Sequence, residues 1–171
     1  MRKRKVISAG ALVFSCILVL MVNVAETAGA EGKSVYVVRH YYDYDGLLVF
    51  AIEGEQLVLQ EAVDIEYHGI GPVDIAVDDE SESLFISYED SGEEGGNIIE
   101  IYSSKTLEHV GKAVLIGPSN ITGLAFDSAN NRLLATDRNT NKLWLIDWDV
   151  ETKTLETEPE CVELGLSLIH I

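Results

Sequence analysis

Polar side chains that could hold a ligand recur at the ends of short apolar runs in this 171-residue chain. A carboxylate and a histidine from neighbouring runs could coordinate a divalent cation or share a proton. Residues 43–46 and 90–94 are acidic enough to suggest Ca²⁺, although neither stretch has the alternating ligands of an EF-hand loop. The simpler interpretation is that polar loop tips are solvated. The candidate ligand or metal residues are His40, His68, Asp74, Glu89, Asn120, Asp137 and Arg138.

No catalytic residue can be assigned from a motif. The sequence contains no glycine-rich phosphate loop, no nucleophile elbow, no Cys/His metal cluster and no basic aromatic surface. No motif indicates a cofactor. The acidic loops suggest one candidate, a divalent cation such as Ca²⁺. We therefore expect an interaction or scaffold module. The alternative is a metal-assisted hydrolase or lyase that would use His40, His68, Glu89 and Asp137.

The elements that must position these side chains repeat with a fixed period. The apolar run that begins at Leu84 recurs 49 residues later at Leu133, and a related run begins 49 residues earlier at Val35. Asp78 and Asp127 precede the two later runs at the same distance. An Asp at the head of a β-turn accepts hydrogen bonds from the backbone two residues on, so its recurrence needs no functional explanation. Equal spacing of this kind is typical of a repeat protein.

Each repeat contains about four short strands separated by Gly, Pro and polar turns. This is typical of a β-propeller blade, and nearly continuous apolar runs suit a blade buried on both faces. A two-layer β-sandwich is the structural alternative. We predict an all-β fold, an incomplete β-propeller of about 2.5–3 four-stranded blades, whose first unit lacks an innermost strand. The expected strands are Ser34–Arg39, Gln56–Asp64, a run starting at Leu133, and residues 47–53, 73–77, 84–88, 97–102, 107–116, 121–126, 143–147 and 154–164.

Two pairs of runs resemble the YVTN type of propeller repeat, in which a strand ending near Thr-Asn is followed by a short polar turn and a strand ending Val-Ile-Asp. They are residues 84–87 with 97–102, and 133–136 with 141–147. The resemblance covers residues 34 to about 164. The sequence departs from the pattern at 90–96, where an acidic loop replaces the tight turn, and at 39–46, where aromatic residues fill it. The resemblance implies a propeller but no single function, because such repeats occur in surface-layer proteins, secreted enzymes and interaction modules.

In a propeller, the loops that leave the second strand and the loops that enter the first strand meet at one end of the central channel. Here these are residues 40–45, 88–94 and 137–141, with 68–74 and 118–122. A ligand is expected there, since loops on a rigid scaffold carry function. Trp144 and Trp148 lie in or just after a strand and are more typical of core or inter-blade packing.

The N-terminus has the three parts of a secretory signal. Residues 1–5 are basic, 6–24 are largely apolar, and Ala28-Gly29-Ala30 offers a cleavage site after Ala30. We expect residues 1–30 to be a helical signal peptide, with an uncleaved membrane anchor as the alternative. The partial propeller would then occupy residues 31–165. Either alternative places the protein in the secreted space, the periplasm or the cell surface.

The formal net charge is −17, and −20 once residues 1–30, with four basic and one acidic side chain, are set aside. Such a charge makes nucleic acid and anionic lipid unsuitable partners. A protein or carbohydrate at the cell surface is the expected partner, and membrane contact only through an uncleaved N-terminal segment. Asn120-Ile121-Thr122 is a glycosylation sequon. Cys161 is the one cysteine after residue 30, so it either pairs outside this chain or is a buried thiol.

The chain is expected to be the N-terminal part of a longer protein. Three partial blades cannot close a ring of the four to eight that propellers use. The last six residues, Leu166-Ser167-Leu168-Ile169-His170-Ile171, are what the DNA CTGTCTCTTATACACATC encodes. That string resembles the transposase end sequence of sequencing-library adapters. We expect residues 166–171 to be an adapter artefact.

Overall fold

The computed structural model describes residues 22–25, 34–39, 46–65, 71–89 and 97–164. Every regular element in this part of the chain is a β-strand, and the strands form three antiparallel sheets in sequential order. Blade 1 consists of β1 (Val22–Ala25), β2 (Ser34–Arg39), β3 (Gly46–Glu53) and β4 (Gln56–Asp64). Blade 2 consists of β5 (Gly71–Asp78), β6 (Ser83–Glu89), β7 (Ile98–Ser103) and β8 (His109–Val114). Blade 3 consists of β9 (Ile121–Asp127), β10 (Arg132–Asp137), β11 (Lys142–Asp149), β12 (Thr154–Leu155) and β13 (Glu160–Glu163).

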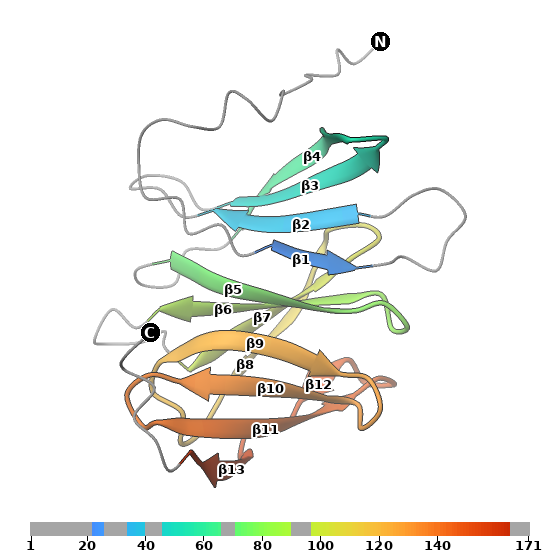
Figure 1. Cartoon of the computed structure of the whole chain (residues 1–171). Helices are drawn as coiled ribbons and strands as arrows, with labels where there is room; N and C mark the ends of the chain where they lie inside the picture. The colour runs from blue at the N-terminus through green and yellow to red at the C-terminus, as the bar shows by residue number, and fades with distance from the viewer. Residues whose placement is uncertain (1–21, 26–33, 40–45, 66–70, 90–96, 165–171) are drawn as a thin grey trace.

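The three blades follow one another with their first strands innermost. β5 contacts β1 on one side and β9 on the other, and Figure 1 shows the three sheets one after another, with blade 1 at the top, blade 2 in the middle and blade 3 at the bottom. Within each blade the chain then runs outward strand by strand. This is the arrangement of consecutive propeller blades, and it differs from two sheets facing each other in a sandwich.

The nearly continuous apolar strands are explained by burial on both faces of the middle blade. Along β6, Leu84 and Ile86 belong to the core shared with blade 1, whereas Phe85 belongs to the core shared with blade 3. Successive side chains of a strand point to opposite faces, so each must be apolar when both faces are covered. Phe85 stacks on Phe126 and meets the edge of Trp148, with ring centroids 5.7 and 4.9 Å apart. Aromatic contacts therefore join blades 2 and 3.

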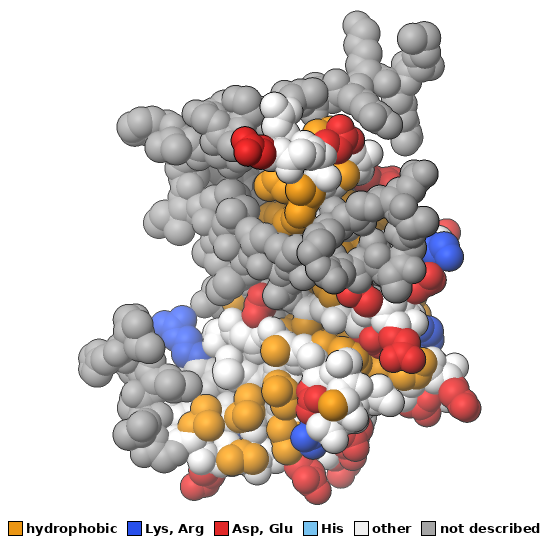
Figure 2. Space-filling model, turned by 45° about the vertical axis from the view of Figure 1, so that its right-hand side comes forward, with side chains coloured by type: hydrophobic (Ala, Val, Ile, Leu, Met, Phe, Trp, Pro, Cys, Tyr) orange, Lys and Arg blue, Asp and Glu red, His pale blue; other side chains and the backbone are white. Residues whose placement is uncertain are grey.

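One face of blade 3 is packed and the other is open. Figure 2 shows hydrophobic side chains gathered over the lower sheet, where blade 3 lies. Leu134 and Leu145 are partly exposed and alternate with the buried Leu133 and Ile146. The exposed pair therefore faces away from blade 2.

The structure corrects two expectations about strands. Blade 1 does have an innermost strand: residues 22–25, expected at the end of the helical signal segment, form β1, and Val22 pairs with Val37. The rest of the expected signal segment lies outside the described residues. The single outer strand expected over 154–164 is divided into β12 and β13, because Pro159 has no N–H to donate between them. Among the described residues no helix is long and apolar enough to cross a membrane.

Candidate functional site

The expected binding end of the blades is where β6 and β10 end and β5 and β9 begin. Four of the seven candidate residues can be placed there, namely Asp74, Asn120, Asp137 and Arg138. His40 and His68 lie outside the described residues. Glu89 is the last residue of β6, but its side chain is also outside the described part. The proposed histidine–carboxylate grouping therefore stays a prediction.

Asp74 joins the inner strands of blades 2 and 3. Its Oδ2 accepts a hydrogen bond from the Leu124 amide at 2.7 Å, and its Oδ1 accepts one from the Ile75 amide at 2.8 Å. The side chain is 9% exposed. Burial raises the pKa of Asp74 above its ordinary value, and the donors Leu124 and Ile75 offset only part of that rise. Both oxygens are occupied by backbone, so Asp74 acts as an inter-blade clamp.

Asp137 organises the two loops of blade 3 at this end. Its Oδ2 accepts a hydrogen bond from the Ser119 amide at 2.8 Å. Its Oδ1 accepts hydrogen bonds from the amides of Asn139 at 2.8 Å and Thr140 at 3.1 Å. The residue is 3% exposed, so it is neither a solvated loop tip nor an open metal ligand. This turn is an Asx arrangement, a role that the sequence analysis assigned to Asp78 and Asp127 and not to Asp137.

The same local arrangement closes the turn after β5. The Glu80 amide donates to Asp78 Oδ1 at 3.1 Å, two residues on, as expected from the sequence. At the corresponding turn of blade 3, Asp127 accepts from Asn130 and Arg132, and these bonds lower the pKa of Asp127. The recurrent aspartates therefore shape turns.

Asn120 is the candidate residue with a free acceptor. The Arg138 amide donates to the backbone oxygen of Asn120 at 2.9 Å and ties the two loops together. Asn120 is 8% exposed, and its buried Oδ1 has no hydrogen-bond partner within the described part of the chain. Because buried polar atoms are nearly always paired, this oxygen marks a place for a water or a ligand group.

Gly117 and Trp144 pack closely beneath these loops. Gly117 has φ +114°, and a Cβ on it would stand 2.7 Å from the Trp144 ring. Trp144 and Trp148 both belong to the core between blades 2 and 3, which confirms that they are packing residues. The Lys142 ammonium lies 5.5 Å from the centre of the Trp144 ring. Trp144 thus supports the loop that carries Ser119 and Asn120.

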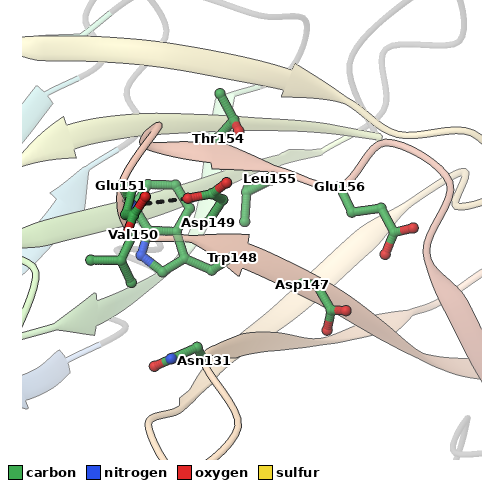
Figure 3. A pocket seen from close by; sticks show the side chains of 9 residues that line it. All are labelled: Asn131, Asp147, Trp148, Asp149, Val150, Glu151, Thr154, Leu155 and Glu156. Atoms are coloured by element: carbon green, nitrogen blue, oxygen red, sulfur yellow. Dashed lines mark hydrogen bonds between the residues drawn. The ribbon is translucent and has the colours of Figure 1, made fainter.

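A pocket of about 680 Å³ opens at the opposite end of blade 3, between the turns after β9 and β11. β12 pairs with one end of β11 and β13 with the other, which leaves residues 156–159 between them, and Glu156 lines the pocket. Figure 3 shows the hydrogen bond from the Glu151 amide to Asp149 Oδ1, which is 2.9 Å long. Within the described residues, no group of three or more His, Cys, Asp or Glu side chains is arranged to hold a metal ion. The pocket is lined by Asn131, Asp147, Trp148, Asp149, Val150, Glu151, Thr154, Leu155 and Glu156.

The sequence analysis did not single out the pair Glu100 and His109. Glu100 lies in β7 with its side chain fully buried, and it contacts Nε2 of His109 on β8. The His109 ring is partly exposed and meets the Tyr102 ring edge-on at 5.2 Å. One signal was available, because Glu100 is the only charged residue in an otherwise apolar run.

The environment of Cys161 was left open by the sequence. Cys161 is an exposed free thiol on β13, so the alternative of a buried thiol is wrong.

No family model and no curated protein matches the sequence. Solved structures do resemble the chain. The periplasmic gluconolactonase of Pseudomonas aeruginosa has a TM-score of 0.63 at 17% identity, over 84% of this chain and 39% of that one. A candidate 6-phosphogluconolactonase of Bacteroides fragilis has a TM-score of 0.57 at 18% identity, over 79% and 40%. The WD40 repeats of RRP9 have a TM-score of 0.55 at 10% identity, over 94% and 44%.

The fold is an incomplete β-propeller. The all-β class and the blade architecture expected from the repeats are confirmed. The chain spans about two fifths of the length of the structures it matches. At these identities the likeness shows the propeller fold alone, and the proteins concerned differ in function. The YVTN assignment within the propeller fold stays a resemblance.

Proposed function

We propose that this chain forms blades of an exported propeller that acts as an interaction module at the cell surface or in the secreted space. Its partner would be a protein or a carbohydrate, bound at the loop end that carries Ser119, Asn120 and Arg138. The observation that most supports this proposal is the hydrogen bonding of the Asp74 and Asp137 carboxylates. Their four carboxylate oxygens accept backbone hydrogen bonds, so two of the candidate acids stabilise a rigid platform.

The charge of the chain limits the kinds of surface that a partner can present. At a formal net charge of −17, the chain suits a neutral partner surface better than an anionic one. The Oδ1 of Asn120 is buried, so a water beneath the partner, rather than the partner itself, would donate a hydrogen bond to it.

Binding to immobilised glycans and to extracted cell-surface proteins tests this proposal. Arg138→Glu at the loop end should weaken binding at least tenfold. The matched control Glu151→Gln, in a turn at the opposite end of blade 3, should leave binding unchanged. Binding that responds to Glu151→Gln and not to Arg138→Glu would contradict the proposed surface.

A second candidate is a metal-assisted lactonase. The likeness in fold to two gluconolactonase structures favours it, by analogy alone. His40, His68 and Glu89 would then have to supply the metal or proton chemistry, since Asp137 is engaged with backbone amides. Hydrolysis of a sugar lactone that depends on added Ca²⁺, Mg²⁺ or Zn²⁺, and that is lost in His68→Gln, would favour this candidate over the interaction module.

A further inference from the structure

The open face of blade 3 has apolar residues at the positions that form the apolar part of the face by which blade 2 holds blade 3. On blade 2, Phe85 and Ile101 are directly opposite each other and are 0% and 2% exposed. The corresponding opposed pair on blade 3 is Leu134 and Leu145, and both are partly exposed. The open face of blade 3 is thus an apolar contact surface without its counterpart among the described residues.

The outer strand shows the same correspondence. Ala113 on β8 is opposite Ile99 and is 4% exposed. On β13, Val162 is opposite Leu143 and is 48% exposed. The apolar surface therefore extends from the second strand, β10, to the outermost strand, β13.

The backbone leaves blade 3 as it leaves blade 2. The Leu115 amide donates to the Asn97 oxygen at 2.9 Å just before the chain crosses to blade 3. The Leu164 amide makes the same contact with the Asn141 oxygen, at 3.3 Å. Leu164 therefore stands where a connection to another blade begins.

The polar contacts that hold blade 3 on blade 2 have no equivalent on the open face. Lys153 donates to the Ser81 backbone oxygen and, at 3.3 Å, to Ser83 Oγ. The position of Ser83, first in its strand, is taken by Arg132 on blade 3, and Arg132 binds Asp127 at 3.3 Å. The position of the clamp residue Asp74 is taken by Gly123, since these residues lie opposite Ser87 and Thr136 at equivalent places in β6 and β10. A lysine of another blade placed at this edge would therefore lie beside the guanidinium of Arg132, which Asp127 holds in position.

We propose that the open face of blade 3 is the docking surface for one further four-stranded blade of a longer form of this chain. The contact is apolar at its centre, along Leu134 and Leu145. At the rim beside Arg132 the incoming blade carries a carboxylate or a neutral side chain in the position that Lys153 has in blade 3. The proposal is independent of the ligand of the protein.

An extended chain tests this. The test protein is the chain through Leu164 followed by a second copy of residues 116–164. Only the second copy carries Lys153→Glu. The extension should raise the midpoint of thermal unfolding by about 5 °C or more and leave a monomer, because the added blade buries the open face. An extension that keeps the lysine should give a smaller rise, since the lysine lies beside Arg132.

Two controls separate docking from a general effect of added chain. Leu145→Lys in the first copy should abolish the rise in the extended chain, and should shift the midpoint of the unextended chain by less than about 2 °C. In the unextended chain, the same substitution should lower the fluorescence of a bound hydrophobic dye at least twofold. Any of four results would overturn the proposal: no rise on extension, a rise that Leu145→Lys does not change, unchanged dye binding, or a dimer of the unextended chain that Leu145→Lys dissociates. Such a dimer would assign the face to a second copy.

Discussion

Asp74 and Leu124 connect two blades across 50 positions of the sequence, through a hydrogen bond of 2.7 Å from the Leu124 amide to Asp74 Oδ2. The other oxygen of the same carboxylate accepts from Ile75 within blade 2. Two blades therefore share one buried acceptor. Strand pairing within each blade does not create such a link, because its hydrogen bonds join only strands of one sheet, whereas the Leu124 and Ile75 amides belong to the edge strands β9 and β5 and donate to Asp74.

Replacing Asp74 by asparagine should weaken the junction of blades 2 and 3. An amide has one acceptor oxygen, so its NH₂ group would face one of the two backbone donors. We expect Asp74→Asn to lower the free energy of unfolding by about 1–3 kcal/mol at pH 7. Urea denaturation measures this, with Asp147→Asn at an exposed position as the control. Equal effects of the two substitutions would show that the clamp contributes nothing.

The raised pKa of Asp74 predicts an unusual pH dependence. The folded protein keeps this proton at pH values where the unfolded chain, with an ordinary pKa of 3.8, has released it. The contribution of Asp74 to stability is therefore fully present below pH 3.8 and is lost as pH rises through the raised pKa. The free energy of unfolding of the wild type minus that of Asp74→Asn should fall as pH rises from about 3.5 to 7. A difference that rises with pH would contradict the raised pKa.

Gly117 should not tolerate a side chain, whereas Gly111 should. A Cβ at Gly117 would stand 2.7 Å from the Trp144 ring and would require a φ of +114°, which L-residues rarely adopt. A Cβ at Gly111 meets nothing within 4 Å. We expect Gly117→Ala to cost about 2–4 kcal/mol and Gly111→Ala to change stability by less than about 1 kcal/mol. Thermal unfolding of the two variants decides this, and similar midpoints would refute the close approach.

Glu100 and His109 should be energetically coupled. A fully buried carboxylate that loses one hydrogen-bond partner costs more than the loss of an exposed contact. We expect His109→Gln and Glu100→Gln each to destabilise the protein by about 1–3 kcal/mol, and the double variant to cost less than the sum of the two. A double-mutant cycle by urea denaturation measures the coupling. Additive effects would mean that the pair contributes no stability of its own.

The repeat made the blade architecture predictable, and tertiary contacts account for most of what it missed. Equal spacing placed Leu84 and Leu133 at the same point of successive second strands, as the pairing registers show. The link from Asp74 to Leu124 is invisible to local pattern, because it depends on how two sheets pack. β1 was missed for another reason: residues 22–25 continue an apolar run that is typical of a signal segment.

The candidate site was predictable in its position but less so in its chemistry. Asp78 and Asp127 were expected as turn formers, whereas Asp137 was expected as a candidate ligand residue, and the structure shows it accepting three backbone hydrogen bonds. Polarity alone does not distinguish a side chain that binds backbone from one that faces a ligand. Asn120 stands out only because its Oδ1 is buried without a described partner.

The two copies of one turn suggest a stabilising substitution. Glu82 and Asn131 occupy the last position of the turn between the first and second strands of blades 2 and 3, with φ values of 53° and 50°. Left-handed backbone is costly for most L-residues, and asparagine adopts it more readily than glutamate. Glu82→Asn should therefore raise the free energy of unfolding by about 0.5–1 kcal/mol, and Asn131→Glu should lower it by a similar amount.

The exposed ion pair of Glu82 with Lys105, 3.3 Å apart, is the competing effect in this comparison. Exposed pairs contribute about 0–1 kcal/mol, so losing it could reduce the gain. Lys105→Met measures that loss separately, because it removes the pair and leaves the backbone at Glu82 unchanged. If Glu82→Asn lowers stability by as much as Lys105→Met does, the ion pair outweighs the backbone strain at this turn.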